Sequence, residues 1–78
     1  MQLGTRWPVG GDTPARLPAA VVDAVRTVEA EVAGFDTSAW RWTLTWLEGR
    51  PIVELDDGTV IRYDSVQDRA VITPPPTD

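Results

Sequence analysis

The chain has 78 residues, with no cysteine and no histidine, and its twelve acids outweigh seven arginines for a formal charge of -5. Without cysteine and histidine, disulfide bonds, thiolate metal sites and the usual neutral-pH general base are excluded. The acidic balance also opposes binding to nucleic-acid phosphates. We therefore expect no cofactor, no metal ion and no nucleic-acid partner.

The length indicates one domain, which buries only about 60 to 65% of the surface of its unfolded chain. No apolar stretch approaches the ~20 residues that a membrane-spanning helix needs, and the first residues do not resemble a secretion signal. These patterns predict a cytoplasmic protein with no membrane partner. The use of arginine alone as the basic residue, with abundant Ala, Val, Asp and Pro, is typical of GC-rich coding, as in actinobacteria.

Residues 1–16 contain five glycine or proline residues, which exclude a helix and predict an extended N-terminal arm with at most a short extended piece at residues 2–7. Trp7 is the strongest apolar anchor of this arm. Two interpretations are open: Trp7 either closes one end of the core, or it stands exposed as an anchor for a partner protein.

A helix is predicted to begin at Pro18 and to end near Ala33. Glu29 and Glu31 lie in its C-terminal half, where the helix dipole disfavours acids, and the sequence offers no reason for them. Phe35 is expected to pack under the helix end. The buried side of the helix is a stripe of valines at helical spacing, which consists of Val21, Val25, Val28 and Val32.

Residues 40–47 alternate between large apolar and polar side chains, which is the pattern of a strand with one buried face. Two further strands are predicted at residues 51–55 and 59–63. A two-residue turn at Glu48 and Gly49 pairs the first strand with the second, and a three-residue turn at residues 56–58 pairs the second with the third. The predicted register places Trp46 opposite Pro51, Leu44 opposite Val53, Trp42 opposite Leu55, and Val53 opposite Ile61.

This register divides the side chains between two faces. The core face, on which the helix is expected to lie, carries Trp40, Trp42, Leu44, Trp46, Val53, Leu55, Ile61 and Tyr63. The opposite side, the mixed face, carries Arg41, Thr43, Thr45, Leu47, Ile52, Glu54, Val60 and Arg62.

A short fourth strand is predicted at residues 70–73, before three prolines that end any strand pairing. The expected fold class is α+β, with one N-terminal helix packed on a three- to four-stranded antiparallel β-meander. The expected organisation is an extended arm at residues 1–16, a single α+β domain at residues 17–73 and a proline-rich disordered tail at residues 74–78.

The mixed face is the candidate binding surface, because Leu47, Ile52 and Val60 form an apolar patch beside Arg41 and Arg62. Together with Trp7, these five residues are the predicted protein-binding residues. Arg62 is also expected to form an ordinary surface pair with Glu54. Either this patch is open to solvent, or the arm or the tail folds across it.

These patterns favour a small acidic, non-catalytic protein-binding domain, of an accessory or adaptor type, whose partner is a protein. The alternative is an inhibitor of a basic protein, of the antitoxin, immunity or anti-restriction type, for which association should depend strongly on salt. A homodimer through open sheet edges is a further option. An enzyme is not expected, because the only carboxylate pair in reach, Glu54 with Asp56 or Asp64, lies on an exposed hairpin without an enclosing pocket.

Overall fold

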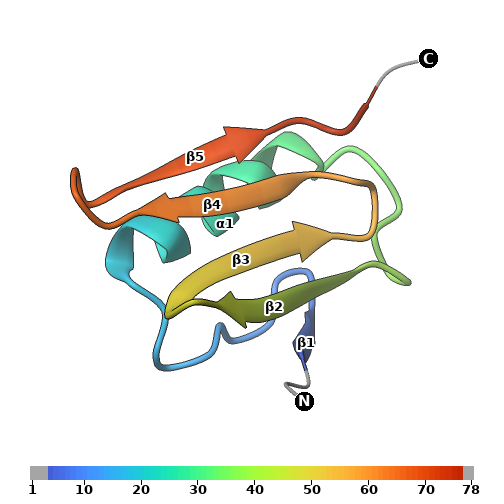
Figure 1. Cartoon of the computed structure of the whole chain (residues 1–78). Coiled ribbons are helices and arrows are strands. Elements are labelled where there is room, and N and C mark those ends of the chain that lie inside the picture. The colour runs from blue at the N-terminus through green and yellow to red at the C-terminus, as the bar shows by residue number, and fades with distance from the viewer. Residues whose placement is uncertain (1–3, 77–78) are drawn as a thin grey trace.

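The computed structural model describes residues 4–76, which form one helix and a five-stranded sheet (Figure 1). The strands are antiparallel and follow the order β1-β2-β3-β4-β5 across the sheet. The helix lies on one side of the sheet, against β4 and β5. This arrangement confirms the predicted α+β class. In chain order the elements are β1 (Thr5–Pro8), α1 (Ala19–Glu31), β2 (Arg41–Leu47), β3 (Arg50–Leu55), β4 (Val60–Asp64) and β5 (Arg69–Thr73).

Strand β1 is the element that the sequence did not predict as part of the sheet. It pairs with β2, and Trp7 lies opposite Trp42. The strand is short because Gly4 precedes it and Pro8, which has no N–H to donate, is its last residue. Residues 5–8 of the predicted arm are therefore part of the sheet, and residues 1–3 lie outside the described part.

The two central hairpins have the predicted register. Trp46 lies opposite Pro51 and Leu44 opposite Val53, across a turn in which Glu48 has φ 53° and Gly49 has φ 79°. Positive φ at both central residues is the two-residue turn that matches the twist of paired strands. At the next hairpin the Leu55 N–H donates to the carbonyl of Thr59 at 2.9 Å, which closes the three-residue loop.

The helix begins after Pro18 as predicted, but it ends at Glu31, two residues before the predicted end at Ala33. Its first turn contains no acidic residue, and no side chain caps its N-terminus. Valine is also a mediocre helix former, so packing against the sheet has to supply much of the stability of this helix. The predicted valine stripe makes that contact, because all four of its members are buried.

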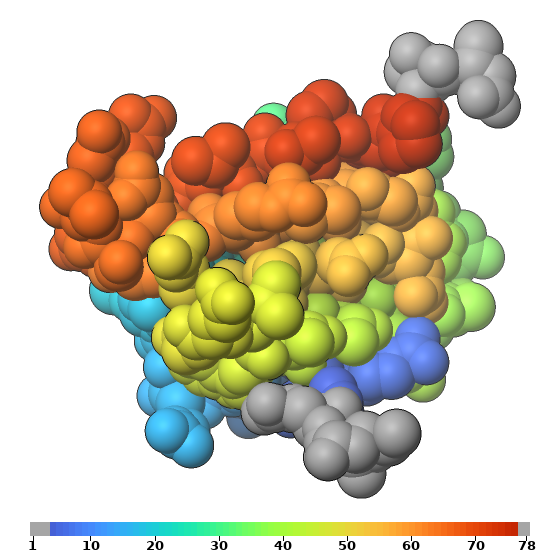
Figure 2. Space-filling model, viewed as in Figure 1, coloured from blue at the N-terminus to red at the C-terminus, as the bar shows by residue number. Residues whose placement is uncertain are grey.

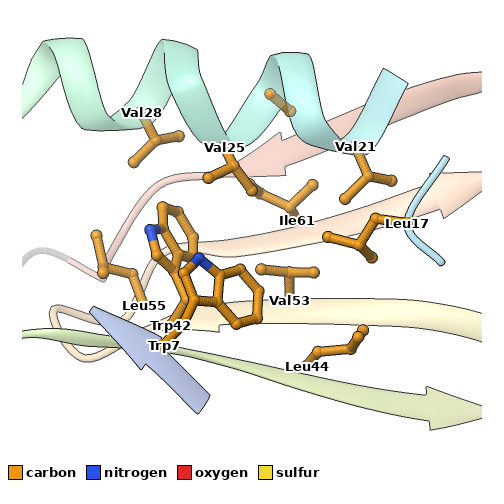
Figure 3. Close-up of a cluster of buried hydrophobic side chains, with 11 residues drawn as sticks. Trp7, Leu17, Val21, Val25, Val28, Trp42, Leu44, Val53, Leu55 and Ile61 are labelled. Atoms are coloured by element: carbon orange, nitrogen blue, oxygen red, sulfur yellow. The ribbon is translucent and has the colours of Figure 1, made fainter. Parts of the chain in front are cut away.

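The core lies between the helix and the sheet (Figure 3). In this view Val21, Val25 and Val28 point from the helix toward the sheet side chains. The rings of Trp7 and Trp42 stack with their centroids 6.3 Å apart. Truncation of a buried tryptophan to alanine costs about 3–5 kcal/mol. That is a large part of the roughly 4–12 kcal/mol expected for the whole domain.

Of the two aromatic residues beside the start of β2, Trp40 packs against the core as predicted, whereas Phe35 does not. Phe35 is 66% exposed, so the prediction that it packs under the helix end is wrong. Val32 fills that position, and the turn after it carries Phe35 to the surface. There its ring stacks on Trp40, which precedes β2 and is only half-buried.

Glu29, whose charge conflicts locally with the helix dipole, connects three parts of the fold. Its Oε2 accepts hydrogen bonds from the backbone N–H of Gly10 at 2.8 Å and from the indole N–H of Trp42 at 3.0 Å. Its Oε1 accepts one from Arg26 at 2.7 Å, and this arginine also donates to the carbonyl of Gly11. The side chain is only 11% exposed, so it joins the helix to the β1–α1 loop and to β2.

These contacts lower the pKa of Glu29. Partial burial of the carboxyl raises its pKa, but hydrogen bonds from Gly10, Arg26 and Trp42 outweigh burial, and the pKa falls below its ordinary value of 4.5. A carboxyl with a lowered folded-state pKa stabilises the fold above its unfolded-state pKa. That contribution is lost as the pH falls from 4.5 through the lower folded-state value.

We expect Glu29→Gln to lower the free energy of unfolding at neutral pH by about 1–3 kcal/mol, because hydrogen bonds to a charged group are lost. The difference from the wild type should narrow as the pH falls below 4.5, as the wild-type carboxyl gains a proton. Urea unfolding followed by tryptophan fluorescence measures both values. Glu31→Gln, on the exposed side of the same helix, is the matched control, and an equal loss in both variants would contradict this role for Glu29.

Candidate interaction face

The mixed face is not covered by any segment of residues 4–76. In Figure 1 the helix lies behind the sheet, and Figure 2, from the same side, shows the side chains of β2 to β5 at the surface. Leu47 is 58% exposed. The part of the tail that is described, residues 74–76, has no regular secondary structure and lies at the β3–β4 turn, where a Cβ on Gly58 would be 3.2 Å from Pro76. Residues 77 and 78 lie outside the described part.

Pairing of β1 and β5 extends the mixed face beyond the residues that the sequence placed there. Val71, which is 47% exposed, lies opposite Arg62, and Ile52 lies opposite Arg62 on the other side. Ile52, Arg62 and Val71 therefore form one row across β3, β4 and β5, and neighbouring strands in this row are about 4.8 Å apart. By the same alternation the mixed face also carries Arg6, Arg50, Asp64, Arg69 and Thr73.

This face carries most of the positive charge of an acidic chain. Five of the seven arginines lie on it, whereas its strands present only two acids, Glu54 and Asp64. Asp64 is engaged within its own hairpin, because one carboxylate oxygen accepts hydrogen bonds from the N–H groups of Val66 and Gln67. The surface therefore differs in sign from the formal charge of -5 for the whole chain.

One end of the mixed face is hollowed beside the β2–β3 turn. This hairpin depression has a volume of about 180 Å³, which suits one or two side chains and is below the size of most cofactor sites. Its apolar side chains come from β2, β3 and β4, and two arginines flank them. The lining residues are Leu47, Glu48, Arg50, Pro51, Ile52, Arg62 and Tyr63.

The two arginines of the hairpin depression have no partner within the described residues. The side chains of Arg50 and Arg62 form no hydrogen bond there and no ion pair within 4.0 Å. Arg6, by contrast, pairs with Asp56 at 3.3 Å, and Arg69 donates to Gln67. The expected pair between Arg62 and Glu54 is therefore not formed. Glu54 lies opposite Val60, two positions along the strand from Arg62, which leaves the Arg62 guanidinium free for another anion.

Tyr63 also lines the hairpin depression, although its side chain lies on the core face of the sheet, where it packs against the core. The hydroxyl donates a hydrogen bond to Asp68 in the β4–β5 turn. That bond raises the pKa of Tyr63 above its ordinary value of 10.0, because it holds the phenolic proton in place. The tyrosine is therefore a neutral, mainly apolar part of the lining at neutral pH.

The structure brings together only some of the predicted binding residues. Leu47, Ile52 and Arg62 line the hairpin depression, but Val60 and Arg41 lie toward the other end of the same face. The backbone N–H of Arg41 donates to the Asp56 carboxylate at that end. Trp7 is not an exposed anchor, because it is 5% exposed within the core.

Arg50 and Val71 are the residues of this face that sequence reasoning missed. The predicted turn at residues 48–49 already placed Arg50 opposite Leu47, so its position could have been found. Val71 could not be placed, since the register of β5 depends on a turn with no strong local signal. In that turn Asp68 adopts a φ of 51°, which few residues other than glycine and asparagine favour.

The arrangement offers binding chemistry, with no sign of a reactive centre in the described residues. Guanidinium groups bind carboxylates, and aliphatic side chains bury apolar groups. No group of three or more metal-ligating side chains lies together in the described part of the chain. No helix in residues 4–76 is long and apolar enough to cross a membrane. The absence of catalytic activity stays a prediction from the sequence.

Comparison of the chain with models of protein families, with curated proteins and with solved structures found no match. The site therefore has to be interpreted from its own geometry.

We expect Leu47→Asp to change the free energy of unfolding by no more than about 0.5 kcal/mol, because an exposed side chain contributes little to the fold. Leu44→Asp, the same change on the core face of the same strand, should leave the protein unfolded, since it buries an unpaired charge. Circular dichroism and urea unfolding distinguish these outcomes. If Leu47→Asp also unfolds the protein, Leu47 belongs to the core and the mixed face is not a free surface.

Proposed function

We propose that this chain is a small non-catalytic protein-binding domain, of an accessory or adaptor type, which docks a partner protein on the mixed face. The observation that carries the proposal is an exposed aliphatic patch, with Leu47 and Val71 about half exposed, on a sheet side that no described segment covers. Apolar groups with an arginine-containing polar surround are the composition of protein interfaces.

The helix side of the sheet also supports this proposal, because it forms the core and leaves the mixed face available for binding. Trp7, Trp42 and the valine stripe are buried there, so the fold does not need the side chains of the mixed face. A protein of this size has little stability to spare, and exposed aliphatic residues on an open sheet carry a risk of aggregation. We therefore expect exposed aliphatic residues on such a sheet where they bind a partner protein.

The alternative of an inhibitor of a basic protein finds less support at this face. Most charged groups there are arginines, which repel a basic partner, and apart from Glu54 and Asp64 the acids of the described residues lie in turns, loops and the helix. A cytoplasmic location and a homodimer stay predictions from the sequence.

We expect Leu47→Asp to abolish capture of the partner from a lysate of the native organism, with the fold retained. Val66→Asp is the matched control, because Val66 is 92% exposed but lies in the β4–β5 turn, outside the mixed face. The measurement is affinity capture with the wild type and both variants, followed by mass spectrometry. A protein captured equally well by the wild type and by Leu47→Asp would contradict docking on this face.

A further inference from the structure

The free charges of the hairpin depression restrict the chemistry of its occupant. Arg50 and Arg62 keep their positive charge at all physiological pH values, and each presents a planar set of donors that matches a carboxylate. Every other arginine of the mixed face has a hydrogen-bond partner among the described residues: Arg6 binds Asp56, Arg41 binds the Trp40 carbonyl and Arg69 binds Gln67. The two arginines without partners line the same depression.

Apolar side chains line the same depression as these two arginines. Leu47 and Ile52 contribute aliphatic groups from the mixed face. An occupant therefore has to supply an aliphatic group beside its negative charges. Glu48 at the rim removes part of the positive excess, which favours one or two carboxylates over a dense polyanion.

From the two unpaired arginines beside aliphatic side chains we infer that the hairpin depression binds an acidic segment of a partner protein. This segment carries aliphatic side chains beside its carboxylates. The inference rests on the proposed function and names the chemistry of the partner. The carboxylates bind Arg50 and Arg62, and an aliphatic side chain packs on Leu47 and Ile52. Val71, in line with Ile52 and Arg62, extends the same surface toward the β5 edge.

Two other occupants fit the surface less well. Single-stranded nucleic acid is bound by aromatic side chains that stack on bases, whereas the apolar groups exposed on the mixed face are aliphatic. The formal charge of -5 also repels a polyanion as it approaches. A second copy bound by a twofold axis through the hairpin depression would place Arg50 and Arg62 near the same residues of its partner, so like charges oppose that contact.

Titration of the labelled protein with short synthetic peptides tests this inference by NMR. One peptide alternates aspartate with leucine and valine; in a second, serine replaces the aliphatic residues; in a third, arginine replaces the aspartates. We expect only the first peptide to shift the amide signals of Leu47, Arg50, Ile52 and Arg62. Its affinity should fall as salt is added, because the pairing is electrostatic.

Arg62→Ala and Arg50→Ala should each weaken binding of the first peptide about tenfold, as loss of one charge-assisted hydrogen bond predicts. Arg69→Ala, which removes the same charge from the mixed face but lies outside the hairpin depression, is the control and should weaken it less than about twofold.

Equal binding of the serine or arginine peptide, no binding of the first peptide, or binding of single-stranded DNA that Arg62→Ala weakens would each overturn the inference. If Leu47→Asp still abolishes partner capture in that case, the proposed function stands with a partner of different chemistry. If Leu47→Asp leaves capture unchanged, the proposed function fails independently of the peptide result.

Discussion

A single helix of thirteen residues has to cover one side of a five-stranded sheet, and this constraint organises the molecule. Such a helix is about 20 Å long and 10 Å wide, whereas five strands span roughly 20 Å across. The helix lies against β4 and β5, so the β1 to β3 part of the core face needs other cover. The stacked pair Trp7 and Trp42, with Leu17 from the loop before the helix, fills that space. The large aromatic side chains cover the part of the sheet that a second helix would otherwise cover. Glu29 joins the helix to the β1–α1 loop and to β2, and this arrangement buries the two tryptophans.

The opposite side of the sheet follows from the same constraint. The described residues place no second layer there, because each segment between residues 4 and 76 is used either in the sheet, in the helix or in a connection. Its mixed face is therefore free to carry side chains that the fold does not require. Aliphatic groups and unpaired arginines at that surface cost solubility and specificity unless a partner uses them. The way in which the core is covered therefore accounts for the open mixed face that we propose as the binding surface.

Much of the fold could be predicted from the sequence, because its signals are local. Alternation in residues 40–47 and the two turns determine the register of β2 to β4, and the valine spacing determines the buried side of the helix. Features that depend on distant contacts could not be predicted. Strand β1 has four residues and a proline, and it becomes a strand because pairing with β2 buries Trp7. Glu29 conflicts with the helix dipole locally, and its donors Gly10 and Trp42 lie 19 and 13 residues away.

The candidate site likewise combines features that could be predicted from local sequence signals with features that depend on distant contacts. Alternation along the strands identified Leu47, Ile52 and Arg62, which line the hairpin depression. The positive charge of the mixed face could not be predicted, because the formal charge of the whole chain sums the charges on both sides of the sheet. The clustering of five arginines appears only when β1 and β5 are paired to their neighbours.

Methyl NMR of the free protein with a soluble paramagnetic agent tests the central claim most directly, which is that the mixed face is open while the core face is closed. Our account predicts strong relaxation of the Leu47 and Val71 methyl groups and little relaxation of those of Leu44 and Val53, which are buried on the other side of the sheet. Equal protection of both sets in the monomer would contradict it, since the mixed face would then be covered by the chain itself.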